Sequence, residues 1–161
     1  MKAIYPGSFD PITYGHLDII ERASLLYEEL VIVIMNNDEK KCFFSVEERV
    51  DMIKQTTKHL KNVSVEIGEG LTVNYARSIG ANVLIRGIRA VSDYEYELQL
   101  ASANMQLASD IETIFLLAKP EYSFLSSSTA KTIAKNSGDL TKFVPDIVVK
   151  KLAQAYKKIQ F

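Results

Sequence analysis

Residues 2–16 read Lys-Ala-Ile-Tyr-Pro-Gly-Ser-Phe-Asp-Pro-Ile-Thr-Tyr-Gly-His, and they contain the first strand, loop and helix start of the predicted fold. The short apolar run at 2–5 predicts a strand, which the following Pro-Gly pair ends. Apolar residues then recur at helical spacing between residues 15 and 30, which predicts an amphipathic helix. A strand, a polar loop and a helix are therefore expected in direct succession.

The alternation of strands and helices continues along the chain. The β-branched run Leu-Val-Ile-Val-Ile-Met at 30–35 predicts a buried strand, and the capping-box pattern Ser-Val-Glu-Glu at 45–48 predicts a helix start. Further strands are expected at 63–67, 82–86 and 112–118, and further helices at 45–60, 71–79 (before Gly80), 93–109, 127–136 and 145–159. This order predicts a parallel sheet with helices on both faces.

These elements predict one α/β domain over residues 1–161. Right-handed crossovers favour a Rossmann-like, doubly wound parallel sheet of five strands in the order 3-2-1-4-5, followed by C-terminal helices. In such a sheet the ligand crevice lies beyond the carboxyl ends of the first and fourth strands, where the winding direction reverses.

The composition excludes several classes of protein. The chain has 161 residues, 47% apolar and 24% charged, as in an ordinary soluble domain. A formal net charge of -1 argues against a basic nucleic-acid binder, and no apolar run approaches the ~20 residues that cross a bilayer. The N-terminus has too short an apolar run for a secretory signal. The single cysteine, Cys42, permits neither an intrachain disulfide nor a cysteine metal cluster, so we expect a cytoplasmic protein.

Glycines, cations and hydroxyl groups follow the predicted strands at one edge of the sheet. They lie at 6–16 after the first strand, 40–41 after the second, 86–89 after the fourth and 122–128 after the fifth. Helix N-termini at the same edge offer free backbone N–H groups and the positive end of a dipole. The edge therefore suits a polyphosphate anion.

Each of the prominent residues at this edge has a functional and a structural interpretation. His16 can donate a hydrogen bond to a phosphate oxygen, or it can cap its helix. Arg86 and Arg89 suit bidentate phosphate binding, and the alternative is ion pairing with Asp93, Glu95 or Glu97. The serines at 126–128 favour a phosphate nest over a simple N-cap.

Other residues and motifs carry weaker indications. Taken from the residues alone, Lys40 belongs to a solvated polar loop, and Cys42 is a plain side chain. The chain has no G-x-x-x-x-G-K-[ST], no G-x-S-x-G and no G-x-G-x-x-G after the first strand. These absences exclude a P-loop kinase and weaken hydrolase and dinucleotide-binding hypotheses.

Two short motifs, T-x-G-H at 13–16 and S-S-S-x-x-K at 126–131, resemble the paired signatures of the nucleotidylyltransferase superfamily. Longer strings are similar to the bacterial phosphopantetheine adenylyltransferase family; they lie at 5–16, 44–50, 84–90, 94–101 and 138–145. The resemblance covers nearly the whole chain. It implies transfer of the adenylyl group of ATP to 4′-phosphopantetheine, giving dephospho-coenzyme A and pyrophosphate, with Mg2+ on the phosphates.

The implied chemistry agrees with the residues. The attacking phosphate is already anionic, so catalysis needs alignment and charge neutralisation and no protein nucleophile. The resemblance also implies a homohexamer built as a dimer of trimers. Coenzyme A is a candidate partner, as a feedback inhibitor. Neither nucleic acid nor membrane is an expected partner.

The resemblance assigns roles residue by residue. His16 would stabilise the transition state. ATP would contact Ser8, Phe9, His16, Gly87, Ile88, Arg89, Glu97, Tyr122, Ser123, Phe124, Leu125, Ser126, Ser127 and Ser128. The acceptor would contact Ser8, Lys40, Thr72 and Arg86, and no protein ligand to the metal is implied. Two positions depart from many relatives: Ser8 replaces threonine, and Lys135 replaces an arginine, which would exchange a fork for a point charge.

Two other functions stay open at this point. One is a related transferase that acts on nicotinamide mononucleotide or glycerol phosphate, which the strings at 84–101 argue against. The other is a catalytically silent nucleotide sensor, which would need the same edge of the sheet but not His16.

Overall fold

The computed structural model describes residues 1–35 and 41–159 of the chain. Within these residues, five parallel strands form a sheet in the order β3-β2-β1-β4-β5, which confirms the predicted order. The strands are β1 (Lys2–Gly7), β2 (Glu29–Met35), β3 (Val63–Gly68), β4 (Val83–Ile88) and β5 (Glu112–Leu117). Because β1 pairs with both β2 and β4, the winding reverses between β1 and β4, as predicted.

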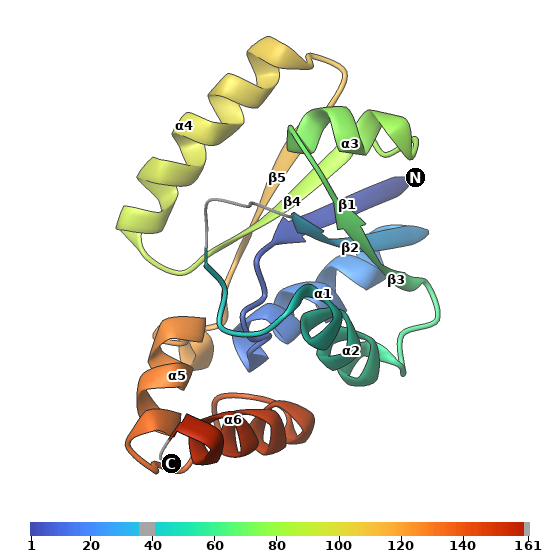
Figure 1. The fold of residues 1–161 in the computed structure, drawn as a ribbon. Helices are drawn as coiled ribbons and strands as arrows, with labels where there is room; N and C mark the ends of the chain where they lie inside the picture. Colours follow the sequence, from blue (N-terminus) through green and yellow to red (C-terminus); the bar gives the residue numbers. More distant parts are fainter. Residues whose placement is uncertain (36–40, 160–161) are drawn as a thin grey trace.

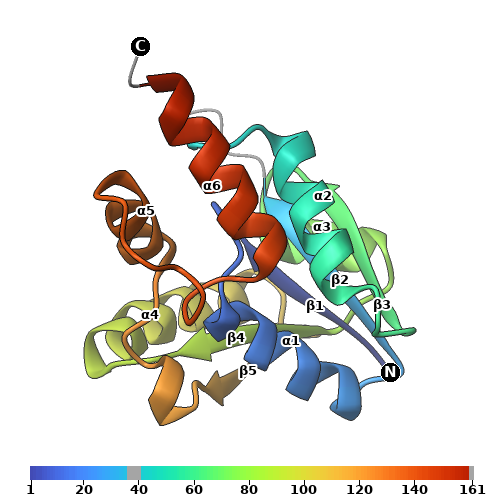
Figure 2. The ribbon, with the colours of Figure 1, turned by 90° about the horizontal axis from the view of Figure 1, so that it is seen from below.

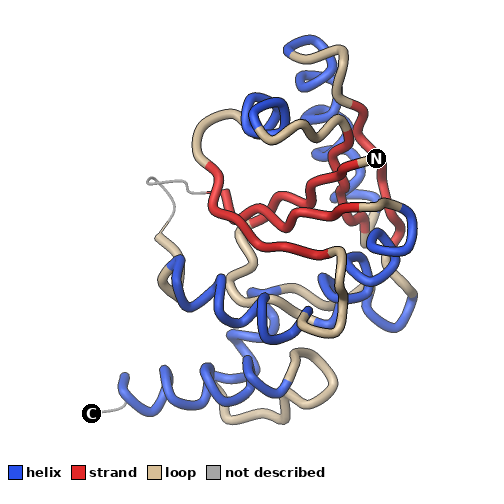
Figure 3. Tube along the Cα trace, turned by 90° about the vertical axis from the view of Figure 1, so that its right-hand side faces the viewer, coloured by secondary structure: helices blue, strands red, loops and turns tan. Residues whose placement is uncertain are grey.

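Helices cover both faces of the sheet (Figures 1 and 3). The α-helices are α1 (Tyr14–Leu26), α2 (Val46–Thr57), α3 (Thr72–Ser78), α4 (Val91–Leu107), α5 (Ser127–Lys135) and α6 (Asp146–Ile159). A short 3-10 helix, η1 (Pro120–Tyr122), follows β5 and was not expected from the sequence. Figure 1 shows α3 and α4 above the sheet and the other α-helices below it. Figure 2, seen from below, shows α6 lying between α5 and α2.

Alternating side chains of the central strands divide the core into two clusters. On β1, Tyr5 belongs to the larger cluster, with α1, α2 and α6, whereas Ile4 belongs to the smaller one, with α3. Burying both faces explains why β2 is apolar at nearly every position, with Leu30 to Ile34 fully buried. Full burial of such side chains contributes roughly 1.5–3 kcal/mol each, so this strand stabilises both layers.

The first helix is shorter than the sequence predicts. It ends at Leu26 rather than near residue 30, and Tyr27 already has extended backbone angles, with φ -125° and ψ 144°. The amide of Asn62 donates to the carbonyl oxygens of Ser24 and Tyr27 at 2.8 and 2.9 Å and satisfies the helix end. The helix therefore ends before Glu29, where β2 begins.

The predicted helix stop at Gly80 is present as a left-handed C-terminal cap. Gly80 has φ +71°, a conformation that glycine adopts without steric cost. Its N–H donates to Arg77 O at 3.1 Å, and Ala81 N–H donates to Ala76 O at 2.9 Å, which is the Schellman pattern. This cap turns the chain directly from α3 into β4.

Helix α4 leaves many of its apolar side chains exposed. Glu97 is its buried residue, whereas apolar side chains of the same helix face outward, with Tyr94 and Leu98 each 44% exposed and Met105 55% exposed. Monomeric soluble proteins rarely expose contiguous apolar patches of this kind.

Candidate nucleotide-transfer site

The loop after β1 forms one wall of a pocket at the carboxyl edge of the sheet. Phe9 has a left-handed φ of 45° and a ring that is only 2% exposed. A Cβ on Gly7 would lie 2.9 Å from a carbon of that ring, so the loop requires glycine there. An aromatic residue in the left-handed region persists only when its surroundings hold it. The loop is therefore fixed before any ligand binds.

A reciprocal cap joins this loop to α1. The Thr13 backbone N–H donates to His16 Nδ1 at 3.1 Å, and the His16 N–H donates to Thr13 Oγ1 at 3.4 Å. His16 therefore caps its helix, as the structural interpretation predicted. Its ring also lines the pocket, so the capping and pocket-lining positions are occupied by the same side chain.

The cap determines the tautomer of His16, and its surroundings determine its charge. A backbone N–H can only donate, so Nδ1 is the acceptor and the neutral ring carries its proton on Nε2. Burial, followed by the positive charges of Arg89 and Arg86, lowers the pKa of His16 from 6.5 to about 4. At neutral pH the residue is an uncharged hydrogen-bond donor.

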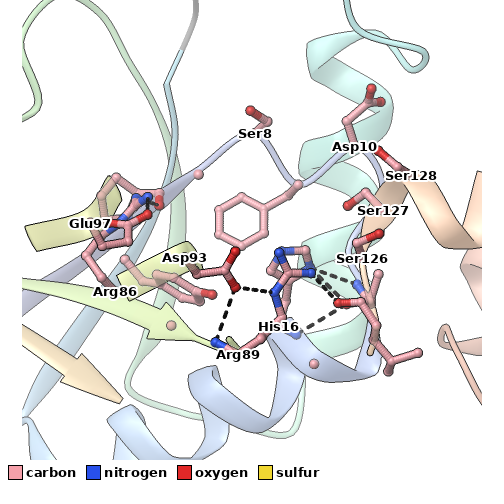
Figure 4. A pocket seen from close by; sticks show the side chains of 18 of the residues that line it. Ser8, Asp10, His16, Arg86, Arg89, Asp93, Glu97, Ser126, Ser127 and Ser128 are labelled. Atoms are coloured by element: carbon pink, nitrogen blue, oxygen red, sulfur yellow. Dashed lines mark hydrogen bonds and ion pairs between the residues drawn. The ribbon is translucent and has the colours of Figure 1, made fainter. Parts of the chain in front are cut away.

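The opposite wall of the pocket is formed by the β4–α4 segment, residues 86–97, where Arg86 meets a carboxylate (Figure 4). Arg86 donates from Nε and Nη2 to both oxygens of Glu97, at 2.7 and 2.5 Å, and from Nη1 to Pro6 O at 2.8 Å. Burial alone would lower the pKa of Arg86, but the hydrogen bonds and charge of Glu97 raise it. The Arg86 guanidinium group is therefore charged and already hydrogen-bonded to Glu97 and Pro6.

Arg89 is held in a similar way. Its Nε donates to Asp93 Oδ2 at 3.1 Å, and its Nη1 donates to the carbonyl oxygen of Leu125. The ion-pair alternative considered for both arginines is thus formed, with Glu97 for Arg86 and Asp93 for Arg89. Both guanidinium groups nevertheless line the pocket.

The serines at the start of α5 divide their roles. Ser126 caps the helix, because its hydroxyl accepts from Thr129 N–H at 3.0 Å. Ser127 donates to Pro11 O at 2.7 Å, which ties α5 to the loop after β1. Both residues line the pocket together with Ser128, so the N-cap and the hydroxyl-rich wall coexist.

Asp10 connects three segments around the pocket. Its carboxylate accepts from Phe43 N–H at 2.7 Å and from Phe44 N–H at 2.9 Å. It also pairs with Lys131 of α5 at 3.3 Å, although Asp10 is only 8% exposed. Lys131 therefore brings a cation to the pocket within reach of the serines.

The pocket has a volume of about 510 Å³, and most of the residues assigned from the sequence line it. These are Ser8, Phe9, His16, Arg86, Gly87, Arg89, Glu97, Leu125, Ser126, Ser127 and Ser128. The residues assigned from the sequence that do not line it are Thr72, Ile88, Tyr122, Ser123 and Phe124. Lys40 lies outside the described residues. Lys135 is exposed at the end of α5 and away from the pocket lining.

Several residues of the pocket had no assigned role in the sequence analysis. They include Tyr5, Asp10, Thr13, Asp93, Tyr96 and Lys131. Lys131 and Thr13 were visible as the terminal lysine and first threonine of the two short motifs. Asp10 and Tyr5 lie inside the string at 5–16, but nothing in the sequence separated a ligand-facing position from a core position.

The chain matches nucleotide-transferring proteins in its sequence pattern and in its fold. A sequence model of the cytidylyltransferase-like family matches residues 4–133. Among solved structures, a Plasmodium falciparum nicotinic acid mononucleotide adenylyltransferase complexed with NaAD superposes with a TM-score of 0.68. It covers 95% of this chain and 94% of its own at 16% identity, and at that identity the likeness shows the fold alone.

Sequence comparison narrows the class. A phosphopantetheine adenylyltransferase of Caldanaerobacter subterraneus subsp. tengcongensis is 48% identical over 97% of this chain and 98% of its own length. One from Thermosynechococcus vestitus is 52% identical over 97% of this chain and 93% of its own length. The chain belongs to the phosphopantetheine adenylyltransferase family, within the cytidylyltransferase-like proteins.

Proposed function

We propose that this protein transfers the adenylyl group of ATP to 4′-phosphopantetheine, giving dephospho-coenzyme A and pyrophosphate, a step of coenzyme A synthesis. The observation that carries this proposal is identity of 48% and 52% to two phosphopantetheine adenylyltransferases across 97% of the chain. The pocket agrees with it chemically, because donors and cations surround a space of about 510 Å³.

In the proposed reaction an oxygen of the acceptor phosphate attacks the α-phosphorus of ATP, a new P–O bond forms, and pyrophosphate leaves with the electrons of the broken bond. The nucleophile is anionic, so no residue has to remove a proton. His16 donates from Nε2 to an oxygen of the α-phosphate as its negative charge increases in the transition state. A neutral ring with a fixed proton suits this role.

The two arginines contribute by exchanging partners. Glu97 and Asp93 hold their guanidinium groups in place before substrates bind. Arg86 would then contact the acceptor phosphate and Arg89 the nucleotide, while the remaining hydrogen bonds keep each group oriented. Ser8, Lys40 and Thr72 complete the proposed acceptor site, and Phe9, Gly87, Ile88, Glu97 and residues 122–128 the proposed ATP site.

We further propose that Mg2+ enters with ATP, held by the oxygens of its phosphates. In the described part of the chain, no group of three or more His, Cys, Asp or Glu side chains could hold a metal ion. The pocket carboxylates Asp10, Asp93 and Glu97 are each paired with a cation. Bound Mg2+ would neutralise phosphate charge, and in such sites substrate phosphates supply many of its ligands.

Pyrophosphate release with ATP, Mg2+ and a series of acceptors tests the function. We expect turnover with 4′-phosphopantetheine and little with nicotinamide mononucleotide or glycerol phosphate, with dephospho-coenzyme A identified by mass spectrometry. Preferred turnover of another acceptor would contradict the proposed substrate. ATP binding without turnover of any acceptor would favour the silent sensor.

The exposed apolar face of α4 supports self-association, and we propose the homohexamer, a dimer of trimers, that the family resemblance implies. A groove of about 480 Å³ lies beside it, lined mostly by apolar residues such as Val91, Tyr94 and Phe115. Light scattering after size-exclusion chromatography should give a mass near six times 18.1 kDa, and a monomer would contradict the proposal.

Coenzyme A is proposed as a feedback inhibitor, tested by its competition with 4′-phosphopantetheine.

The described helices include none that is both long and apolar enough to span a membrane. A cytoplasmic location is proposed because ATP and the reduced acceptor thiol are supplied there. Fractionation of cells that express a tagged copy tests it.

A further inference from the structure

A buried phenol in the wall of the pocket, that of Tyr5, has no role in the proposed reaction. Tyr5 is 6% exposed and lies on β1, where its ring packs with the large core cluster. Its edge-to-face contact with Phe9 has ring centroids 5.3 Å apart, and Phe9 contacts His16 in turn at 5.1 Å. Tyr5 and His16 therefore flank the Phe9 ring.

The Tyr5 hydroxyl faces the pocket and has no hydrogen-bond partner among the described residues. Among the described residues, Thr56 Oγ1 is the side-chain oxygen or nitrogen that is both fully buried and without a partner. Because Tyr5 Oη also has no partner, it is not fully buried, and it retains access to the pocket that Tyr5 lines. A Cβ on Gly87 would come within 3.3 Å of this hydroxyl and 3.2 Å of Ile19. Glycine at 87 thus leaves open the space beside the hydroxyl.

The charges around the hydroxyl indicate what it binds. Arg86 exerts the largest charge effect on Tyr5, followed by Arg89, and Glu97 acts in the opposite direction. Burial dominates and raises the pKa of Tyr5 to about 12, so the hydroxyl keeps its proton and can donate. A protonated phenol that lines the same pocket as two guanidinium groups suits an anionic oxygen. A core position with no need for a donor would be served by phenylalanine.

We propose that Tyr5 is a substrate-binding residue whose hydroxyl donates a hydrogen bond to the acceptor phosphate, next to Arg86. This inference rests on the proposed function. It gives the attacking phosphate a neutral donor on the Arg86 side of Phe9, while His16 serves the α-phosphate on the other side. Two neutral donors can orient the reactants without adding charge that would weaken the attacking oxygen.

The test is Tyr5→Phe, which removes one oxygen atom and leaves the ring. We expect kcat/KM for 4′-phosphopantetheine to fall about 10-fold or more, as for loss of a hydrogen bond to a charged group. The KM for ATP and the melting temperature should be unchanged. Tyr27→Phe is the matched control, because Tyr27 also packs against the core cluster but lies outside the pocket lining.

The outcomes separate the two proposals. Wild-type protein without turnover of 4′-phosphopantetheine would defeat the proposed function. An active wild type whose Tyr5→Phe variant keeps its acceptor kcat/KM, or loses ATP and acceptor affinity equally, would overturn the role of Tyr5 alone. An acceptor-specific loss in Tyr5→Phe, absent in Tyr27→Phe, supports it.

Discussion

The two walls of the pocket differ in how far they are prepared for the reaction. The β1–α1 loop, residues 8–13, is held by internal hydrogen bonds, and His16 has its proton already placed on Nε2. The β4–α4 segment presents two guanidinium groups that carboxylates occupy. In the proposed reaction, the first wall would act as it stands, whereas the second would exchange protein oxygens for phosphate oxygens. We therefore expect substitutions on the first wall to lower kcat most, and substitutions on the second wall to weaken substrate binding most.

Replacing His16 should have the largest effect on the reaction. His16→Ala removes a fixed donor, and loss of one such donor costs about 10²–10³ in kcat. ATP affinity should change little, since the arginines and serines persist. Steady-state kinetics together with calorimetric ATP binding measure the split. His59→Ala, which removes the exposed partner of Glu21, is the control; equal kcat values in the two variants would refute the role of the first wall.

Asp10 tests whether the first wall depends on internal hydrogen bonds. Asp10→Ala leaves the N–H groups of Phe43 and Phe44 and the Lys131 ammonium without their partner, so the free energy of unfolding should fall by about 3 kcal/mol. Urea denaturation of this variant and of Glu47→Ala, an exposed carboxylate on α2, gives the comparison. A loss no greater than that of the control would mean that Asp10 does not hold the wall.

Arg86→Lys tests the second wall. Lysine cannot keep both oxygens of Glu97 and also reach a phosphate, because it presents a single point charge. The KM for 4′-phosphopantetheine should rise about 10-fold, and the KM for ATP much less. Arg77→Lys, at an exposed ion pair with Asp110, controls for charge-preserving substitution. Equal increases in both KM values would show that Arg86 does not belong to the acceptor.

The arrangement of the strands was predictable because it depends on local patterns. Alternating strand and helix signals, with right-handed crossovers, leave few possible sheets, and the glycine at 80 marks its helix end through its own backbone preference. The end of α1 was not predictable in the same way. It depends on Asn62, which is 35 residues from the Tyr27 carbonyl that it caps.

The residues of the site were predictable as a group, but their pairings were not. Position after the strands brought His16, Arg86, Arg89 and the serines to one pocket. Sequence alone left three carboxylates as partners for two arginines, because the choice depends on how α4 lies on β4. The pairing of Asp10 with Lys131 spans 121 residues and exists only through the fold.

The pH dependence of turnover gives the smallest expected effect, and it follows from the protonation of His16 on the first wall. The pKa of His16 is about 4 in the folded protein and 6.5 when exposed, so the folded state keeps the ring neutral through the window between them. The unfolded chain binds the proton first as pH falls. This residue therefore lowers stability progressively from about pH 6.5 to 4 and has no such effect above that range.

Turnover should also depend on the charge of the His16 ring. Between pH 8 and 5 the His16 ring is a neutral donor, so kcat at saturating substrates should vary less than about 2-fold through this group. An NMR titration of its ring nitrogens, with Nδ1 unprotonated throughout that range, would report the state directly. A protonation midpoint near 6.5 accompanied by a parallel loss of kcat would show that the first wall is not prepared in advance, and the contrast between the two walls would then disappear.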